Sequence, residues 1–411
     1  MKKRIVKLSL FILCAMMVAG FALEAAAADV KIAVVYPLSG ALARNGNLTV
    51  QSVKAAMGWV NDRGGIKSLG GAKMVPVIGD GRSTVEGAAS AMERVCRDPK
   101  ITMAVGSWAS SFTMASTEIT ERLGVPHFSI SFSDALTTRG FRYSFFVVPP
   151  SSAQGEVGLK EVVNLARSKG DTVKTVMLVG DNQAASKGFY NACRKNFPKM
   201  GVKIIGEEVW AMGTLTDATP VIQKVKTMNP DIVVFMATAI SEAQMCLMKK
   251  KEFGVKTPFI ANGGWAADPS FVQVGAPTLE GMIIITPTFN SKLTPPDWNK
   301  RSLEQSAKEY SKEAWVGQEL GYAWTYIPVM AEILERAGST DRDKIRDIAS
   351  KIDLKNHIAT KHIPTDGIAF GPKGRLAKKY QGILLVQWQN GKPRCIYPSN
   401  LAVAQPMWAG N

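Results

Sequence analysis

The stretch Val30-Lys31-Ile32-Ala33-Val34-Val35-Tyr36 reads as a short buried strand, and a helical pattern follows it at residues 49–61. Asn61-Asp62-Arg63-Gly64-Gly65 ends that helix with a glycine stop. The same alternation continues, with strands expected at 74–78 and 101–105 and helices at 84–97 and from Ser110 or Ser111 onward. Alternating strands and helices are typical of a parallel, doubly wound α/β sheet.

The alternation restarts after Val147-Val148-Pro149-Pro150. Helices are expected at 152–168, 186–198, 222–228 and 241–253, and strands at 175–179, 203–209, 231–236 and 258–261. A strand at 281–287, helices at 299–310 and 317–337, and short β segments from 367 onward follow, the last with a hairpin turn at Asn390-Gly391. The chain is therefore predicted to hold two similar α/β lobes.

The first residues have the order of a secretory signal peptide. Four basic residues precede an apolar run at 8–23, and the small residues 25–28 follow it. A membrane anchor is the alternative, but the run is shorter than the roughly 20 residues that a span needs. We expect cleavage near Ala28 and a soluble protein exported to the periplasm.

Composition narrows the function classes. With 411 residues and 46% hydrophobic content, the chain is expected to form two or three globular domains. The net charge of +16 comes from scattered cations without a stacking motif, so we expect no nucleic-acid partner. The cysteines beyond the leader match no zinc or redox spacing, and buried free thiols are favoured over disulfides, whose pairing stays open: Cys96, Cys193, Cys246 and Cys395.

Catalytic motifs are missing from the sequence, whereas a binding crevice is indicated. There is no phosphate loop, dinucleotide fingerprint, nucleophile elbow or zinc-protease motif, so we expect neither an enzyme nor a cofactor nor a metal. The segments 106–111 and 128–133 follow the third and fourth strands, where open α/β sheets bind ligands. Ser110 or Ser111 would cap a helix whose amino end suits a carboxylate. The alternative is that these serines only cap and turn the chain.

The chain resembles the periplasmic leucine/isoleucine/valine-binding protein family, the receptors of branched-chain amino acid type ABC importers. The resemblance rests on the order of the segments 34–40, 61–66, 106–111, 124–126, 136–140, 229–233 and 279–281. The resemblance implies an α/β type I periplasmic binding protein, in which two doubly wound parallel-sheet lobes are joined by a three-segment hinge. It implies a signal peptide at 1–28, a first lobe at 29–148 and 280–372, and a second lobe at 149–279 and 373–411.

The resemblance also implies ligand-binding residues. Ser110 matches the serine that binds the ligand carboxylate, Ser131 the position that offers a backbone carbonyl, and Ser133 a hydroxyl residue at the ligand's polar head. Trp108 and Trp265 are expected to flank the cleft and to stack on a flat or apolar ligand.

Other positions depart from the family pattern. Asn45 stands where members often carry an aromatic residue, Ala185 where a tyrosine often covers the ligand, and Gly263 where an acid pairs with the amino group. Because a buried ammonium without a countercharge costs several kcal/mol, the missing acid puts α-amino acid binding in doubt.

The expected function is capture of a small amino acid, carboxylate or amide between the lobes and its delivery to the membrane permease of an ABC transporter, by a monomer. An exported ligand-sensing regulatory subunit with the same fold is the alternative, and an exported α/β enzyme is a third possibility.

Overall fold

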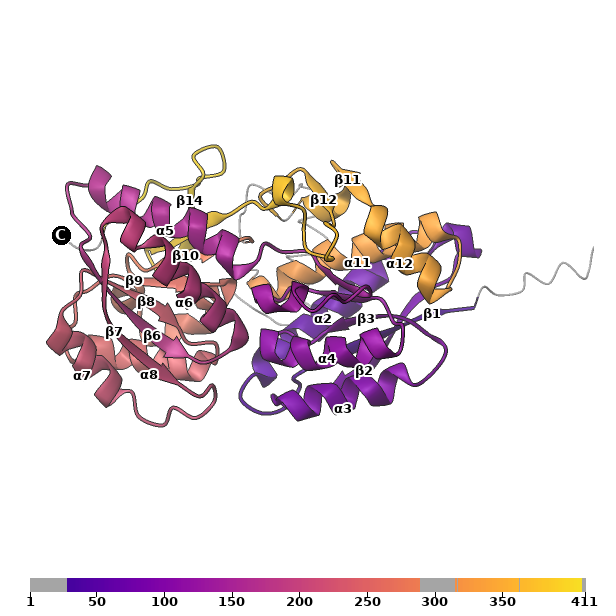
Figure 1. Ribbon diagram of the computed structural model, residues 1–411, viewed down its shortest axis with the longest axis horizontal. Coiled ribbons are helices and arrows are strands. Elements are labelled where there is room, and N and C mark those ends of the chain that lie inside the picture. Colours follow the sequence, from indigo (N-terminus) through magenta and orange to yellow (C-terminus); the bar gives the residue numbers. More distant parts are fainter. Residues whose placement is uncertain (1–27, 289–314, 316, 362, 409–411) are drawn as a thin grey trace, which may run out of the picture.

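The structure, a computed structural model, describes residues 28–288, 315, 317–361 and 363–408 and consists of two lobes, each built on one sheet (Figure 1). The first sheet is parallel throughout, in the order β2-β1-β3-β4-β5. Its strands are β1 (Val30–Tyr36), β2 (Met74–Asp80), β3 (Ile101–Gly106), β4 (His127–Ser129) and β5 (Ser144–Phe146). β3 is buried along its whole length, as expected for a strand covered by helices on both faces.

The second sheet has the order β14-β13-β10-β9-β8-β6-β7. It is parallel except for β13, which runs antiparallel to β10, and β14, which runs antiparallel to β13. Its strands are β6 (Thr175–Asp181), β7 (Lys203–Trp210), β8 (Ile232–Met236), β9 (Phe259–Asn262), β10 (Ile283–Thr286), β13 (Leu384–Gln389) and β14 (Lys392–Tyr397). Positive φ angles at Asn390 and Gly391 confirm the predicted tight hairpin between the last two strands.

Helices cover the faces of both sheets (Figure 1). In the first lobe they are α2 (Ala43–Asn61), α3 (Val85–Cys96), α4 (Ser110–Arg122), α11 (Gln318–Ala337) and α12 (Arg342–Lys351), which is followed by the small hairpin of β11 (Asp353–Lys355) and β12 (Gly367–Ala369). In the second lobe they are α5 (Ser151–Ser168), α6 (Ala184–Asn196), α7 (Thr219–Met228), α8 (Ile240–Glu252) and α9 (Ala276–Leu279).

The described segments change lobe three times along the chain, and one of the predicted boundaries is wrong. The first crossing lies between β5 and α5, and the third between β12 and β13. The second follows β10, which pairs with β9 and β13 and so belongs to the second sheet. The predicted second segment of the first lobe, which starts at residue 280, therefore begins one strand too early, because the hydrophobic pattern of β10 does not indicate which sheet the strand joins. The predicted helix at 299–310 and the predicted signal peptide, apart from Ala28, lie outside the described residues.

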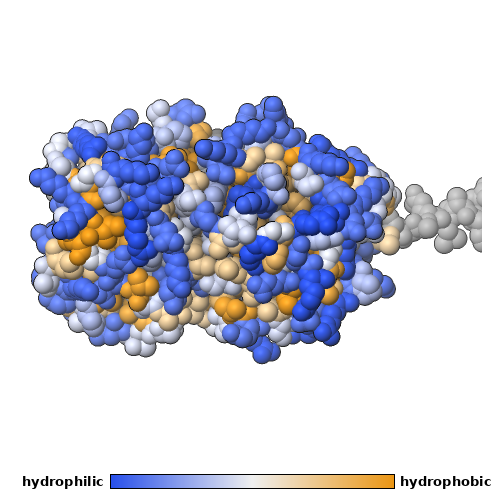
Figure 2. Space-filling view, in the orientation of Figure 1, coloured by the Kyte–Doolittle hydropathy of each residue, from blue (hydrophilic) through white to orange (hydrophobic). Residues whose placement is uncertain are grey.

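Burial follows the predicted pattern. Cys96, Cys193, Cys246 and Cys395 are buried and none of these four forms a disulfide, which confirms the prediction of buried free thiols. The face of the molecule in Figure 2 is mostly hydrophilic, with apolar residues in separate groups. Within the described ranges, no helix combines the length and the hydropathy that a membrane span requires.

Candidate ligand-binding site

A cavity of about 40 Å³ lies between the lobes, beyond the carboxyl ends of strands from both sheets. This is the place where open α/β sheets bind ligands. The first lobe contributes Trp108, Ala109, Ser110, Ile130, Ser131, Phe132 and, from the start of α11, Gln318. The second lobe contributes Gln183, Ala185, Thr238, Asn262 and Trp265. The wall thus combines aromatic and aliphatic surface with hydroxyl and amide groups.

Ser110 lies in the cavity wall as the first residue of α4, but it does not cap the helix. The cap residue is Ala109, which has no side chain that could accept a hydrogen bond, so the prediction that Ser110 or Ser111 caps the helix is wrong. Instead the Ser110 Oγ accepts a hydrogen bond from the Ser133 N–H at 3.2 Å. A hydroxyl that accepts there keeps its own proton free to donate.

Ser131 also lies in the wall, but its polar atoms are engaged within the protein. Its Oγ lies 2.7 Å from Thr113 Oγ1 and donates to the Trp108 carbonyl at 3.0 Å. Its own carbonyl, which the resemblance assigns to the ligand, accepts from Arg375 Nη1 at 2.9 Å. Arg375 Nη2 donates to the Ser133 carbonyl at 2.7 Å, so one buried guanidinium holds both carbonyls of this loop.

Ser133 is buried but does not line this cavity. It faces a neighbouring hollow between the lobes, beside Asp134 and the start of α6. Ser111 lines that same hollow. The structure therefore brings Ser110 and Ser131 together at one wall and turns Ser133 to the other side of the loop.

Trp108 and Trp265 face the cavity from opposite lobes, as predicted. Trp108 has φ +72°, a strained conformation for a bulky residue that is often found at functional sites. Its indole Nε1–H is buried and has no partner among the described residues. The Trp265 Nε1, in contrast, donates to the Asn262 carbonyl at 2.8 Å.

Asn262 carries a free acceptor in the same wall. Its Nδ2 donates to Gln154 Oε1 at 2.8 Å and to the Ile285 carbonyl at 3.0 Å, which orients the amide. Its Oδ1 is buried and finds no partner in the part of the chain that the structure describes. Buried polar atoms are normally hydrogen-bonded, so an unpaired donor and an unpaired acceptor in one wall mark positions for a ligand.

Gly263 explains why the acid of the family pattern is absent. The residue has φ +100°, and a Cβ there would lie 2.9 Å from Trp265 Cδ1 and 3.4 Å from Phe132 Cε2. The Trp265 ring therefore occupies the space that an acidic side chain would need. Gly263 itself is not a wall residue; it shapes the wall by leaving room for Trp265.

Asn45 is also not in the wall. It is buried on α2, and its Nδ2 donates to Glu319 Oε1 at 3.0 Å. Burial, together with the nearby Asp268 carboxylate, raises the pKa of Glu319 to about 7. Asp268 itself accepts from Arg44 Nε and Nη2 at 3.0 and 2.9 Å. These residues form a second layer beside the cavity.

Hydrogen bonds join the two lobes directly on both sides of the cavity. The Ser111 N–H donates to Gln183 Oε1 and the Ala184 N–H donates to Ser111 Oγ, both at 3.2 Å. On the other side of the cavity, Gln318 Oε1 accepts from the Gly264 N–H at 2.7 Å.

Several wall residues were missed by the sequence reasoning. Gln183 and Thr238 follow strands β6 and β8, and Asn262 is the last residue of β9, so their place at the end of a strand could have indicated them. Gln318 and the supporting Arg375 come from distant parts of the chain and carry no such mark.

The two histidines that the structure describes, His127 and His357, make hydrogen bonds within the protein. His127 is buried, with its Nε2 2.9 Å from the Gly106 carbonyl and its Nδ1 3.2 Å from Thr120 Oγ1. Burial lowers its pKa to about 4, so it is neutral at ordinary pH. His357 accepts a hydrogen bond from the Ala359 N–H, and His362 lies outside the described residues.

Two doubly wound lobes, three crossings and a cavity between the lobes define a two-lobed solute-binding protein of the type I periplasmic architecture. The chain belongs to the periplasmic binding protein family, whose model matches residues 29–392.

Known proteins agree with this assignment. A Leu/Ile/Val-binding protein homolog 7 of Brucella abortus is 24% identical, over 92% of this chain and 94% of the relative. The crystal structure of a branched-chain amino acid transporter substrate-binding protein from Streptococcus pneumoniae, in complex with isoleucine, matches with a TM-score of 0.75 at 22% identity, over 89% of this chain and 97% of that one. A solute-binding protein from R. palustris, in complex with benzoate, matches with a TM-score of 0.75 at 15% identity, over 93% of this chain and 99% of that one. The resemblance to the leucine/isoleucine/valine-binding family is confirmed.

Proposed function

We propose that this protein is the periplasmic solute-binding receptor of an ABC importer and that its ligand is a small carboxylate or amide without an α-amino group. The observation that carries the proposal is the chemistry of the wall. Among the described residues, no ionisable side chain lines the cavity, whereas Trp108 and Asn262 offer an unpaired donor and an unpaired acceptor.

An α-amino acid fits this wall poorly. Its ammonium would be buried between the lobes without a carboxylate at contact distance, and burial of an unpaired charge costs several kcal/mol. The volume beside Gly263 that an acid would use is filled by the Trp265 ring. An amide oxygen can instead accept from the Trp108 indole and the Ser110 hydroxyl. A carboxylate can accept from the same groups, and the amino end of α4, which begins at Ser110, offsets its negative charge. The two tryptophans cover an apolar or aromatic body. The relatives leave both classes open, since one was solved with isoleucine and another with benzoate.

Matched ligand pairs test the proposal. Leucine is compared with 4-methylpentanoate and its amide, and phenylalanine with 3-phenylpropanoate and its amide, by thermal unfolding and calorimetric titration of the purified protein. A ligand that binds only the native state raises the unfolding temperature by mass action. We expect stabilisation by the members without an amino group. Stabilisation by leucine or phenylalanine alone would refute the proposed ligand class.

Two substitutions test the assigned groups. Trp108→Phe removes the indole N–H and keeps most of the ring, and Ser110→Ala removes the hydroxyl. Each loses about one hydrogen bond to the ligand, so we expect affinity to fall roughly 5- to 30-fold. Ser133→Ala affects a residue outside the wall and His357→Ala one remote from it, so both serve as controls. Unchanged affinity in the first two variants would remove the site assignment.

A further inference from the structure

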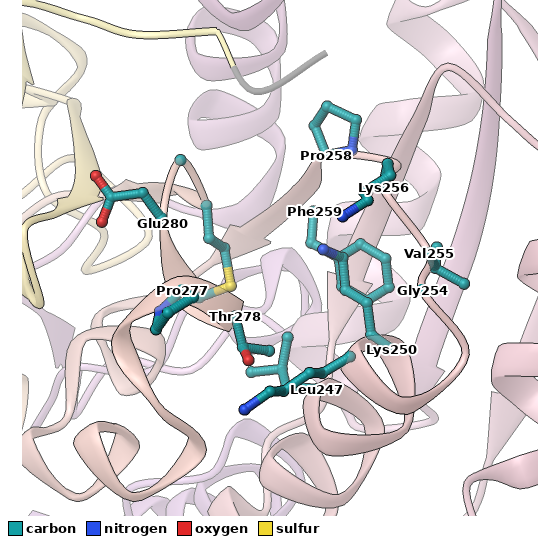
Figure 3. Close-up of a pocket in the computed structure, with 13 residues that line it drawn as sticks. Leu247, Lys250, Gly254, Val255, Lys256, Pro258, Phe259, Pro277, Thr278 and Glu280 are labelled. Carbon is teal, nitrogen blue, oxygen red and sulfur yellow. The ribbon is translucent and has the colours of Figure 1, made fainter. Parts of the chain in front are cut away.

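A second cavity, of about 290 Å³, lies in the second lobe and shares no residue with the cavity between the lobes. It opens at the amino ends of β9 and β10, whereas the interlobe cavity lies at the carboxyl ends of strands. Figure 3 shows Val255, Lys256 and Pro258 on one side of the space and Pro277, Thr278 and Glu280 on the other. The end of α8, with Leu247 and Lys250, completes the wall.

The wall is strongly basic. It contains Lys250, Lys251 and Lys256, and none of these lysines lies within 4.0 Å of a carboxylate in the described chain. Among the described residues of the wall, Glu280 is the only acid, and both of its carboxylate oxygens accept from the Asn390 N–H, at 3.2 and 3.0 Å. The wall thus holds three lysines against one carboxylate and carries an excess of positive charge.

Lys250 is the most embedded of the three. It is half-buried, and its Nζ lies 5.3 Å from the centre of the Phe259 ring. Burial and repulsion from Lys256 lower its pKa to about 8. The neighbouring Lys249 differs, because it lies outside the cavity and pairs with Glu252 at 2.7 Å.

Thr278 supplies an independent sign that this wall receives a ligand. The residue is only 8% exposed, and its Oγ1 is buried without a hydrogen-bond partner in the described ranges. Since buried hydroxyls are normally paired, an unpaired hydroxyl in a cavity wall marks a position for a polar atom from outside. Next to ammonium groups, an oxyanion accepts from the hydroxyl and balances the excess positive charge of the wall.

We propose that this cavity is an oxyanion site that binds a phosphate group, held by Lys250 and Lys256 with a hydrogen bond from Thr278. A phosphate near neutral pH carries between one and two negative charges and several acceptor oxygens, which suits two or three lysines better than a single carboxylate does. The cavity has room for a group attached to the phosphate, so the natural ligand is a phosphate ester. A soluble ester and a phospholipid headgroup share this chemistry.

The test titrates the purified protein with inorganic phosphate and with glycerol 3-phosphate at constant ionic strength, by calorimetry and by ³¹P line width. Lys250→Gln removes the embedded charge, Thr278→Val removes only the hydroxyl, and Lys249→Gln is the matched control on the same helix. Sedimentation with vesicles of phosphatidylglycerol or of phosphatidylcholine tests the lipid source.

We expect saturable binding that falls about tenfold or more in Lys250→Gln and several-fold in Thr278→Val, with Lys249→Gln unchanged. Binding of phosphatidylglycerol vesicles that is lost in Lys250→Gln would support the site and assign a lipid source. Two outcomes would overturn the proposal, because each would show only general attraction of anions to a basic chain. In the first, chloride at the same concentration abolishes phosphate binding. In the second, Lys250→Gln and Lys249→Gln lose the same amount of phosphate affinity. Ligands of the interlobe cavity should bind all three variants normally, so the two proposals can fail separately.

Discussion

The contact between Arg44 and Asp268 predicts how closure of the lobes is maintained. Arg44 lies on α2 of the first lobe, and Asp268 precedes a short helical turn of the second. Arg44 Nε and Nη2 both donate to Asp268 Oδ1, at 3.0 and 2.9 Å. The Asp268 side chain is 1% exposed, whereas that of Arg44 is 36% exposed.

Arg44→Met keeps the length of the side chain and removes the charge. Loss of one partner from a buried ion pair costs about 3–5 kcal/mol, and the partial exposure of Arg44 reduces this to about 2–3 kcal/mol. Because Arg44 belongs to the first lobe and Asp268 to the second, the lost contact is one that only the closed arrangement makes, so we assign the cost to the closed state. At about 1.4 kcal/mol per tenfold, the ratio of closed to open molecules should fall roughly 30- to 150-fold.

Small-angle X-ray scattering measures the effect without a ligand. We expect a larger radius of gyration for Arg44→Met, weaker binding of any interlobe ligand, and little change in the urea midpoint of each lobe. Arg194→Met is the matched control, since Arg194 pairs with Glu207 inside the second lobe and is exposed. An unchanged radius of gyration and unchanged affinity in Arg44→Met would refute the reasoning.

Three further variants test the surroundings of the site. Gly263→Ala places a side chain at φ +100° and 2.9 Å from the Trp265 ring, so urea unfolding should show a loss of at least about 1–2 kcal/mol. Arg375→Met removes two hydrogen bonds from a buried guanidinium to backbone carbonyls and should lower the free energy of unfolding by about 2–4 kcal/mol. Arg375→Lys should restore little of it, because lysine lacks the planar fork. An unchanged free energy of unfolding in Arg375→Met would contradict the role of Arg375. The raised pKa of Glu319, about 7, means that the native state keeps a proton that the unfolded chain releases above about pH 4.3, so Glu319 lowers stability as pH rises toward 7. Glu319→Gln should therefore melt higher than the parent at pH 8 and equally near pH 4; a constant difference across this range would argue against a buried, protonated carboxyl.

The local pattern of the sequence determined the two lobes and one half of the cavity. Strand and helix periodicity depends on near neighbours in the chain, so β1, β3 and α4 can be recognised from the residue pattern alone. Since ligands bind beyond the carboxyl ends of parallel strands, the loops after β3 and β4 could be predicted as a wall, and Trp108, Ser110 and Ser131 lie there. Trp265 was predicted from the stretch 261–265, which the family resemblance places at the site.

Only the tertiary structure decided what these residues face. Three findings depend on segments far apart in the chain: Ser133 lines the neighbouring hollow, β10 pairs with the second sheet, and Arg375 donates to the Ser131 carbonyl. The same holds for Gln318, for the packing of Trp265 over Gly263, and for the basic cavity beside Thr278. Hydrophobic periodicity reports which side of an element is buried, whereas hydrogen-bond partners and cavity walls are set by which distant element arrives there, and that is a property of the packed chain alone.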